Sequence, residues 1–228
     1  MSTFVRRLKY YGFGFGLGVV IVFFFFGNRS CNWGPEARVK AAIMDRVLVA
    51  DSVNKAELLR RGISTSELKK LIEEAEIDFS QSKKEESIKV YYMQSGKFAF
   101  LISMPYESFI AEVNLIEQDA HSYSTNSKGI GSFLYFPKEQ DFIYVPENEL
   151  LESQMKEMGF KDNNALLHAI KTNGFIDFSR SNFNIRPKPE HSIRFIDEKN
   201  RKIEARAIWM KERMEVISFT FDSILPRK

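Results

Sequence analysis

The sequence predicts an α+β protein in which a single transmembrane helix precedes two tandem copies of a helix-helix plus antiparallel meander module. Three observations predict this fold class. Residues 10–27 form an apolar run without a charged side chain. The phrase IDFS occurs at residues 77–80 and again at 176–179, 99 positions later. Both phrases follow two helical patterns and precede three strand patterns, and helices followed by an antiparallel sheet are typical of α+β domains.

The first predicted element is the transmembrane helix, within residues 1–28. Eighteen uncharged residues span about 27 Å as a helix, enough for a slightly short bilayer crossing. Arg6, Arg7 and Lys9 precede the run and favour a cytoplasmic N-terminus, with the bulk of the chain on the other side. A cleaved signal peptide or a lipoprotein site at Cys31 is the alternative. Neither has its small-residue exit signal here, which favours an uncleaved anchor.

Four glycines divide this run at alternate positions, Gly12, Gly14, Gly16 and Gly18. They form two overlapping GxxxG pairs, and residues four apart lie on one face of a helix. Small residues on such a face let a second membrane helix approach closely. We therefore expect these glycines to contact a partner helix, although glycine is also common in membrane helices that only anchor.

A juxtamembrane segment is expected over residues 29–45, and the first module over 46–118. Gly62 is expected to end the first helix in a left-handed conformation, and Ser64 or Ser66 to cap the second. Ser95 and Gly96 mark a tight hairpin between two strands. The expected elements are a strand at 46–52, helices at 55–62 and 64–75, and strands at 77–80, 87–94, 97–104 and 108–116.

A linker is expected over residues 119–141, with SFLYF at 132–136 as a candidate extra strand, and the second module over 142–228. Gly159 is expected to close the first helix of this module, and Asp162 or Asn163 to cap the second. The last strands of the two modules align at an offset of 106. This alignment places three apolar positions of one face opposite three of the other, Ala111, Val113 and Leu115 with Ile217, Phe219 and Phe221.

The repeated phrase has a structural and a chemical interpretation. Alternation of apolar and polar residues is the period of a half-buried strand. Short polar side chains commonly form hydrogen bonds with the exposed backbone where a helix ends and a strand begins, and we expect this structural role for the Asp and Ser of the phrase. Paired catalytic carboxylates are the alternative, but no His, Lys or second acid recurs beside either aspartate. The repeat residues are Ile77, Asp78, Phe79, Ser80, Ile176, Asp177, Phe178 and Ser179.

Composition excludes several classes of site. One cysteine, Cys31, cannot form an internal disulfide, and His121, His168 and His191 lack metal-ligand spacing. No nucleotide-binding or hydrolase motif is present. We therefore predict no catalytic, cofactor-binding or metal-binding residue and no cofactor. From Arg180 onward the sequence has 12 basic and 7 acidic residues. This excess of positive charge indicates a solvated sheet face or, alternatively, a surface for anionic lipid.

The runs SCNWGPEARV and LLRRGIS, the IDFS strand and the meander after it resemble small membrane-anchored proteins of the Bacteroidota that carry a domain of unknown function, family 4258. The resemblance covers residues 1–116 by motif, and the second module by pattern. It implies an α+β fold, apparently duplicated, and a bacterial inner-membrane location with periplasmic modules. Other branches of the family resemble toxin domains with a His early in the helix before the R-G-I-S turn. The helix before Arg60 and Arg61 has no His here, which speaks against nuclease activity.

Three functions remain open from the sequence. The favoured one is non-enzymatic: the two modules bind an envelope protein, as an accessory subunit of a membrane complex. In this interpretation the partners are the lipid bilayer and another membrane or envelope protein, and no nucleic acid is expected. The second is a degenerate toxin that acts on RNA through Arg60 and Arg61. The third is a module that binds anionic lipid or cell wall through its basic C-terminal half.

Overall fold

The computed structural model describes residues 3–26, 34–84, 87–115 and 129–221. It divides into two compact units, Met1–Val39 and Lys40–Lys228, which are described separately. Cys31, which the sequence places beside the expected anchor, lies outside the described residues, as does the 119–128 part of the expected linker.

The first unit contains α1 (Thr3–Phe26). Its apolar side chains from Leu8 to Val22 are exposed, and a Cβ at any of its four glycines would meet no atom within 4 Å. Among the described residues, no helix is both long enough and apolar enough to qualify as a membrane crossing. A second helix, α2 (Pro35–Met44), occupies most of the segment predicted only as juxtamembrane, and Ile43 near its end is fully buried.

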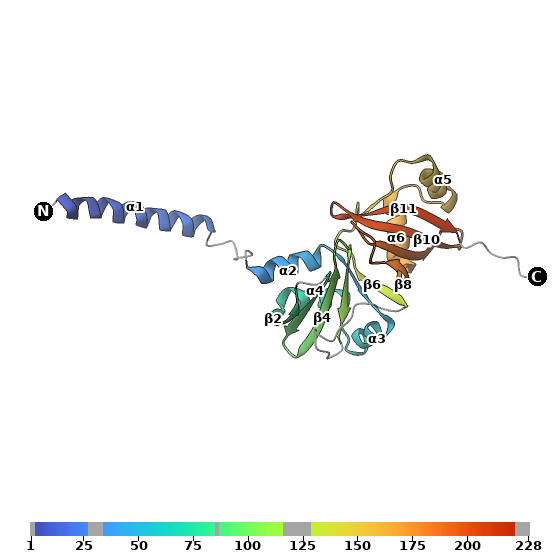
Figure 1. The fold of residues 1–228 in the computed structure, drawn as a ribbon, viewed down its shortest axis with the longest axis horizontal. Helices are drawn as coiled ribbons and strands as arrows, with labels where there is room; N and C mark the ends of the chain where they lie inside the picture. Colours follow the sequence, from blue (N-terminus) through green and yellow to red (C-terminus); the bar gives the residue numbers. More distant parts are fainter. Residues whose placement is uncertain (1–2, 27–33, 85–86, 116–128, 222–228) are drawn as a thin grey trace, which may run out of the picture. The chain divides into compact units, whose positions relative to one another are not determined.

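The second unit is α+β, as predicted, and its described strands form one mixed sheet (Figure 1). The strand order is β2-β3-β4-β5-β1-β6-β8-β9-β10-β11-β7. The two predicted modules therefore share a continuous sheet. The strands are β1 (Val47–Ala50), β2 (Glu76–Lys83), β3 (Ile88–Ser95), β4 (Phe98–Pro105), β5 (Ile110–Asn114), β6 (Ile130–Tyr135), β7 (Ile143–Tyr144), β8 (Phe175–Asn182), β9 (Glu190–Ile196), β10 (Lys202–Met210) and β11 (Arg213–Phe221).

The two halves of the sheet have the same strand order. The first half runs β2-β3-β4-β5-β1, and the second runs β8-β9-β10-β11-β7. In each half the last four strands along the chain form the predicted antiparallel meander. The first strand, however, joins the last one in parallel, β1 with β5 and β7 with β11, so the sheet is mixed. All four residues of β1 are buried, which is typical of a strand covered on both faces.

Helices follow the first strand of each half: α3 (Ser52–Arg60), α4 (Thr65–Glu74), α5 (Glu149–Met158) and α6 (Asn163–Asn173). Ser64 caps α4 in a reciprocal capping box with Glu67, and Asp162 caps α6. Gly62 and Gly159 have φ of +68° and +96°, the left-handed conformation predicted for them.

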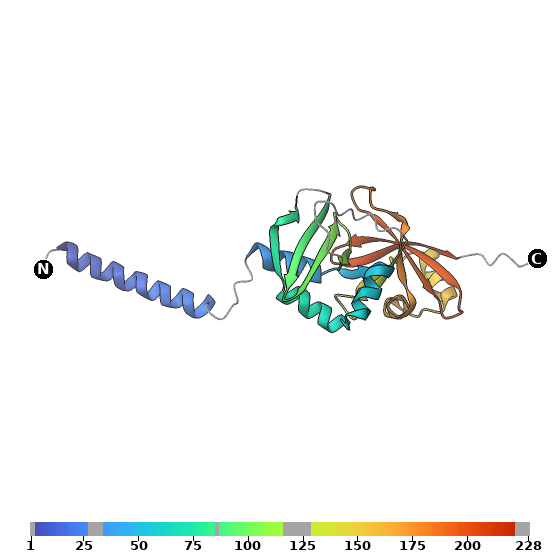
Figure 2. The ribbon, with the colours of Figure 1, turned by 90° about the horizontal axis from the view of Figure 1, so that it is seen from below.

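Each helical pair packs on the strands of its own half. In the first half α4 contacts β3 and α3 contacts β1 and β6, and Figure 2 places both helices beside these strands. In the second half α6 contacts β9 and β7, and α5 contacts β11. The core of the second half also includes Val47, Val49, Phe109 and Ile110 of the first half, so one apolar core continues across the junction.

Two details of the sequence prediction can be compared with the strands. Residues 130–135 belong to β6, which pairs with β1 on one side and β8 on the other, so the candidate extra strand at 132–136 is confirmed over residues 132–135 and joins the halves. The alignment of the last strands at an offset of 106 is wrong. Arg206 pairs with Ser218 but Ala207 pairs with Val216, which leaves Ile217 as an extra residue that is 38% exposed. The bulge reverses the face of β11 at that point.

Candidate functional site

Both copies of the repeated phrase form a wide bulge at the same register position. In the first half Asp78 pairs with Tyr92 and Lys83 pairs with Val90. In the second half Asp177 pairs with Ser192, and the next pair joins Asn182 to Glu190. Four residues of one strand thus stand opposite one residue of its neighbour. Such a bulge leaves backbone groups that the ladder cannot satisfy.

In the first half the polar side chains of the phrase satisfy these groups. Asp78 Oδ1 accepts hydrogen bonds from the backbone N–H of Ser80, at 2.8 Å, and of Gln81, at 3.3 Å. Ser82 Oγ donates to the carbonyl oxygen of Asp78, at 2.6 Å, and accepts from the N–H of Tyr92, at 3.0 Å. Asp78 is half-exposed, and its hydrogen bonds, of which that from the Ser80 hydroxyl contributes most, lower its pKa to about 2.

The second half repeats each of these bonds. Asp177 Oδ1 accepts from the N–H groups of Ser179, at 3.1 Å, and Arg180, at 3.3 Å. Ser181 Oγ donates to the carbonyl of Asp177 and accepts from the N–H of Ser192, at 2.8 and 2.9 Å. Asp78 and Asp177 lie in separate bulges, each occupied by its own turn, so the structure does not bring the two carboxylates together.

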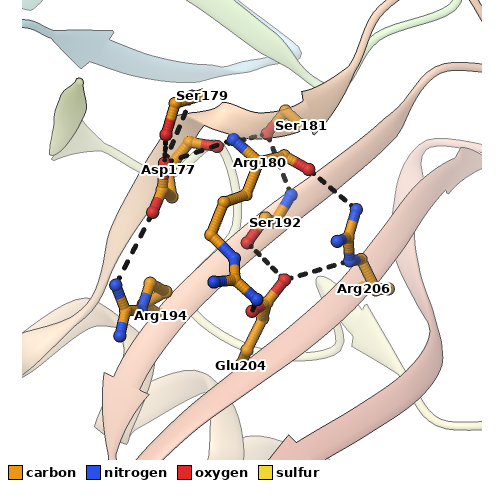
Figure 3. A network of polar contacts seen from close by, with 8 residues as sticks. All are labelled: Asp177, Ser179, Arg180, Ser181, Ser192, Arg194, Glu204 and Arg206. Atoms are coloured by element: carbon orange, nitrogen blue, oxygen red, sulfur yellow. Dashed lines mark hydrogen bonds and ion pairs between the residues drawn. The ribbon is translucent and has the colours of Figure 1, made fainter. Parts of the chain in front are cut away.

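The second bulge differs in carrying an ion-pair network (Figure 3). Glu204 is buried, and its carboxylate pairs with the guanidinium groups of Arg180, at 2.5 Å, and Arg206, at 3.0 Å. It also accepts from Ser192 Oγ at 2.9 Å. Arg194 approaches Asp177 at 3.6 Å. These arginines belong to the basic C-terminal half, and the two carboxylates engage them on the face of the sheet.

A cavity of about 270 Å³ lies on another side of the second bulge. We call it the junction cavity, because residues of both halves line it. The ends of β3 and β4 contribute Ile88 and Tyr106, among others. The bulge contributes Ser179 and Ser181, and the loop that follows contributes Arg186. The junction cavity therefore combines the bulge of β8, an interior strand, with residues of the first half.

Sequence reasoning did not identify a close pairing of a hydroxyl with an imidazole. Ser108 Oγ and His191 Nε2 are 2.7 Å apart, and both residues are fully buried. Phe109 and Phe183 cover the imidazole ring, at centroid distances of 4.3 and 5.2 Å. Burial lowers the pKa of His191 to about 3. Among the described residues no carboxylate orients its other ring nitrogen, so the pair joins the two halves without the geometry of a nucleophile and its base.

The arginines of the RGIS turn are engaged within their own helix. The guanidinium groups of Arg60 and Arg61 both pair with the carboxylate of Glu57, at 2.6 and 2.5 Å. Their hydrogen bonds lower the pKa of Glu57 to about 2. A phosphate would have to displace this carboxylate, so the arrangement does not favour the RNA-binding alternative.

A second buried acid lies in the first half. Glu112 of β5 has its carboxyl opposite the hydroxyl of Ser103, which is 3.4 Å away, and both side chains are buried. Burial raises the pKa of Glu112 to about 8, and the nearby Asp51 carboxylate adds to the increase. The charge pattern of the sequence gave no signal for this residue, because a single Glu within a strand is usually exposed.

Within the part of the chain that the structure describes, no group of three His, Cys, Asp or Glu side chains could hold a metal ion. Comparison of the chain with protein-family models, with curated proteins and with solved structures finds no match. The candidate site therefore rests on geometry alone: the second bulge, its ion-pair network and the junction cavity.

Proposed function

We propose that this chain is a non-enzymatic, single-pass bacterial inner-membrane protein whose two α+β modules bind another envelope protein, as an accessory subunit of a membrane complex. In this proposal the modules are tandem copies, the N-terminus is cytoplasmic and the modules are periplasmic. The identical strand order of the halves and their identical bulges support the duplication. The positive flank and the exposed apolar side chains of α1 support the anchor.

The junction cavity is the observation that carries the binding function. Elsewhere in the second bulge the charged groups are paired with one another, as Arg180 and Arg206 are with Glu204. At the cavity, the hydrogen-bond partners of Arg186 among the described residues are the backbone carbonyls of Phe183 and Ile185, and its guanidinium lies over the ring of Tyr106. An open cavity with an aromatic and an arginine at its rim is typical of a protein-binding surface.

Site-specific crosslinking in native membranes tests this function. A photoreactive amino acid in place of Tyr106, which is 55% exposed, should produce one crosslinked species with a stoichiometric partner. The same label in place of Leu150, which is 66% exposed on α5, is the matched control and should not. Recovery of only the free chain from both positions would contradict the proposal.

The glycine face of α1 gives a second, independent test. Replacing Gly12 and Gly16 together by Leu should keep the chain in the membrane fraction but reduce the amount of partner that co-purifies, because a filled face prevents close helix approach. Arg6, Arg7 and Lys9 stay unchanged in this variant, so the topology is preserved. Wild-type yield of the partner would show that the four glycines do not form an interface.

A further inference from the structure

We propose that the junction cavity binds a carboxylate side chain presented by the partner protein. This inference rests on the proposed binding function and specifies the chemistry of its central contact. It follows from three properties of the cavity: its unused hydrogen-bond donors, its charge and its size.

The first property is the donor capacity of Arg186. A guanidinium carries five N–H donors in a planar fork that matches a carboxylate. The described hydrogen bonds of Arg186 use only Nη1, which lies 3.2 Å from the carbonyl oxygen of Phe183 and 3.5 Å from that of Ile185. The donors on Nε and Nη2 remain for a ligand, and the two backbone bonds and the ring of Tyr106 hold the group in place.

The second property is the charge of the lining. Among the described residues that line the junction cavity none has an acidic side chain, and Arg186 is the cation there. The hydroxyls of Ser179 and Ser181 already donate inside the bulge. The side-chain oxygen of Asn182 accepts from the N–H of Asn184, at 3.0 Å, which leaves its NH₂ group as a donor. The cavity thus offers positive charge and donors, which suits an anion and disfavours a cation.

The third property is size. At about 270 Å³ the cavity is slightly smaller than most sites for cofactors or drug-sized molecules. It is large enough for one side chain, and the aromatic rings of Tyr106, Phe178 and Phe183 supply apolar surface for its methylene groups. An aspartate or glutamate of a partner polypeptide fulfils both requirements, a carboxylate for Arg186 and a short apolar stem for the rings.

Methyl NMR on the full chain in detergent micelles tests the inference. Ile88 lines the junction cavity, so its ¹³C-labelled δ1 methyl group reports on occupancy. The probe is acetyl-aspartate amide, which carries one side-chain carboxylate, and acetyl-asparagine amide is its neutral isostere. We expect the aspartate probe to shift the Ile88 signal saturably in the millimolar range, and the asparagine probe to leave it unchanged. Arg186→Gln should weaken the binding of the aspartate probe by about ten-fold, because charged hydrogen bonds are lost.

Arg213→Gln is the matched control. Arg213 also lies over a tyrosine ring, that of Tyr144, at 4.6 Å, but it does not line the junction cavity. This variant should bind like the wild type. Equal shifts from both probes, no shift in the wild type, unchanged affinity in Arg186→Gln or stronger binding of inorganic phosphate would each overturn the inference. Crosslinking at Tyr106 can still succeed in those cases, so failure of the inference is distinguishable from failure of the proposed function.

Discussion

The same phrase lies at an edge of the sheet in one half of the molecule and inside the sheet in the other. Residues 77–82 belong to β2, an outermost strand, whereas residues 176–181 belong to β8, which has β6 on one side and β9 on the other. The hydrogen bonds from the aspartate and the second serine of the phrase to the bulge backbone are the same in both halves. Their neighbours differ: the interior bulge borders the junction cavity and the ion-pair network around Glu204. The phrase therefore specifies the backbone conformation of the bulge, and the position of the bulge in the sheet determines which side chains and cavities surround it.

The side chains across the bulge also differ between the halves. Following the strand pairing from each aspartate, Tyr92 and Leu101 of the first half correspond to Ser192 and Arg206 of the second. Tyr92 and Leu101 belong to a small apolar cluster with Val90. Ser192 and Arg206 belong to the network around Glu204. The strands across the bulge are thus stabilised by apolar packing in the first half and by charged hydrogen bonds in the second.

Truncating the phenylalanine of the phrase should give the largest difference in stability between the two halves. Phe178 is buried and its ring lies against Gly131 of β6, where a Cβ would come within 2.3 Å of a ring atom. Phe79 is half-exposed at the edge. We expect Phe178→Ala to lower the free energy of unfolding by about 3 kcal/mol and Phe79→Ala by about 1 kcal/mol, because Phe178 is the one of the two that belongs to the buried core cluster. Urea unfolding of the full chain measures both, and equal losses would contradict an interior position for β8.

The sequence predicted this pair of environments only in part. The helices, their caps at Ser64, Asp162 and Gly159, and the strands of each meander follow from local periodicity and cap chemistry, which act over a few residues. The parallel pairings of β1 with β5 and of β7 with β11 do not, because strand neighbours far apart along the chain leave no periodic signal. For the same reason the candidate strand at 132–136 gave no sign of its neighbours, so the fusion of the two modules into one sheet through β6 was not predicted.

The candidate site was less predictable than the fold. The residues of the phrase were identified, and a structural role was expected for Asp78 and Asp177. The junction cavity was not foreseen, because it needs residues of both halves to meet in the fold, and Arg186 stands outside any repeated pattern. Glu112, Ser108 and His191 were missed for a related reason: their burial depends on strands that the sequence could not place.

A buried acid offers the second way to compare the halves. Following the same strand pairing, Glu112 corresponds to Glu215, which is only half-buried. A raised pKa means that the folded chain holds the proton more tightly than the unfolded chain does. The resulting stability is fully present below about pH 4.5 and is lost as the pH rises towards the folded-state pKa of about 8.

Glu112→Gln should therefore be more stable than the wild type at pH 8, by about 2 kcal/mol, and nearly equal to it at pH 4, since the amide replaces a neutral carboxyl. Glu215→Gln is the matched control and should change stability by less than about 0.5 kcal/mol at both values, as exposed substitutions usually do. Chemical unfolding at the two pH values measures the difference. If the difference in unfolding free energy between Glu112→Gln and the wild type is the same at both pH values, Glu112 is solvated in the folded chain.

The smallest effect is expected from the aspartate at the sheet edge. Hydrogen bonds lower the folded-state pKa of Asp78 to about 2 from an ordinary value of 3.8. A lowered pKa in an acid gives stability that is present above the unfolded value and is lost as the pH falls through that of the folded state. The wild type should therefore lose stability between about pH 4 and pH 2, and Asp78→Asn should be slightly less stable at pH 7, with a flatter dependence of stability on pH in that window.

Asp177→Asn is the comparison. It also removes the contact with Arg194, at 3.6 Å, inside the sheet, so its loss of stability at pH 7 should be the larger of the two. Thermal unfolding of both variants at pH 7 and pH 2.5 resolves them. A larger loss at pH 7 for Asp78→Asn than for Asp177→Asn would mean that the edge bulge, and not the interior one, depends more on its carboxylate.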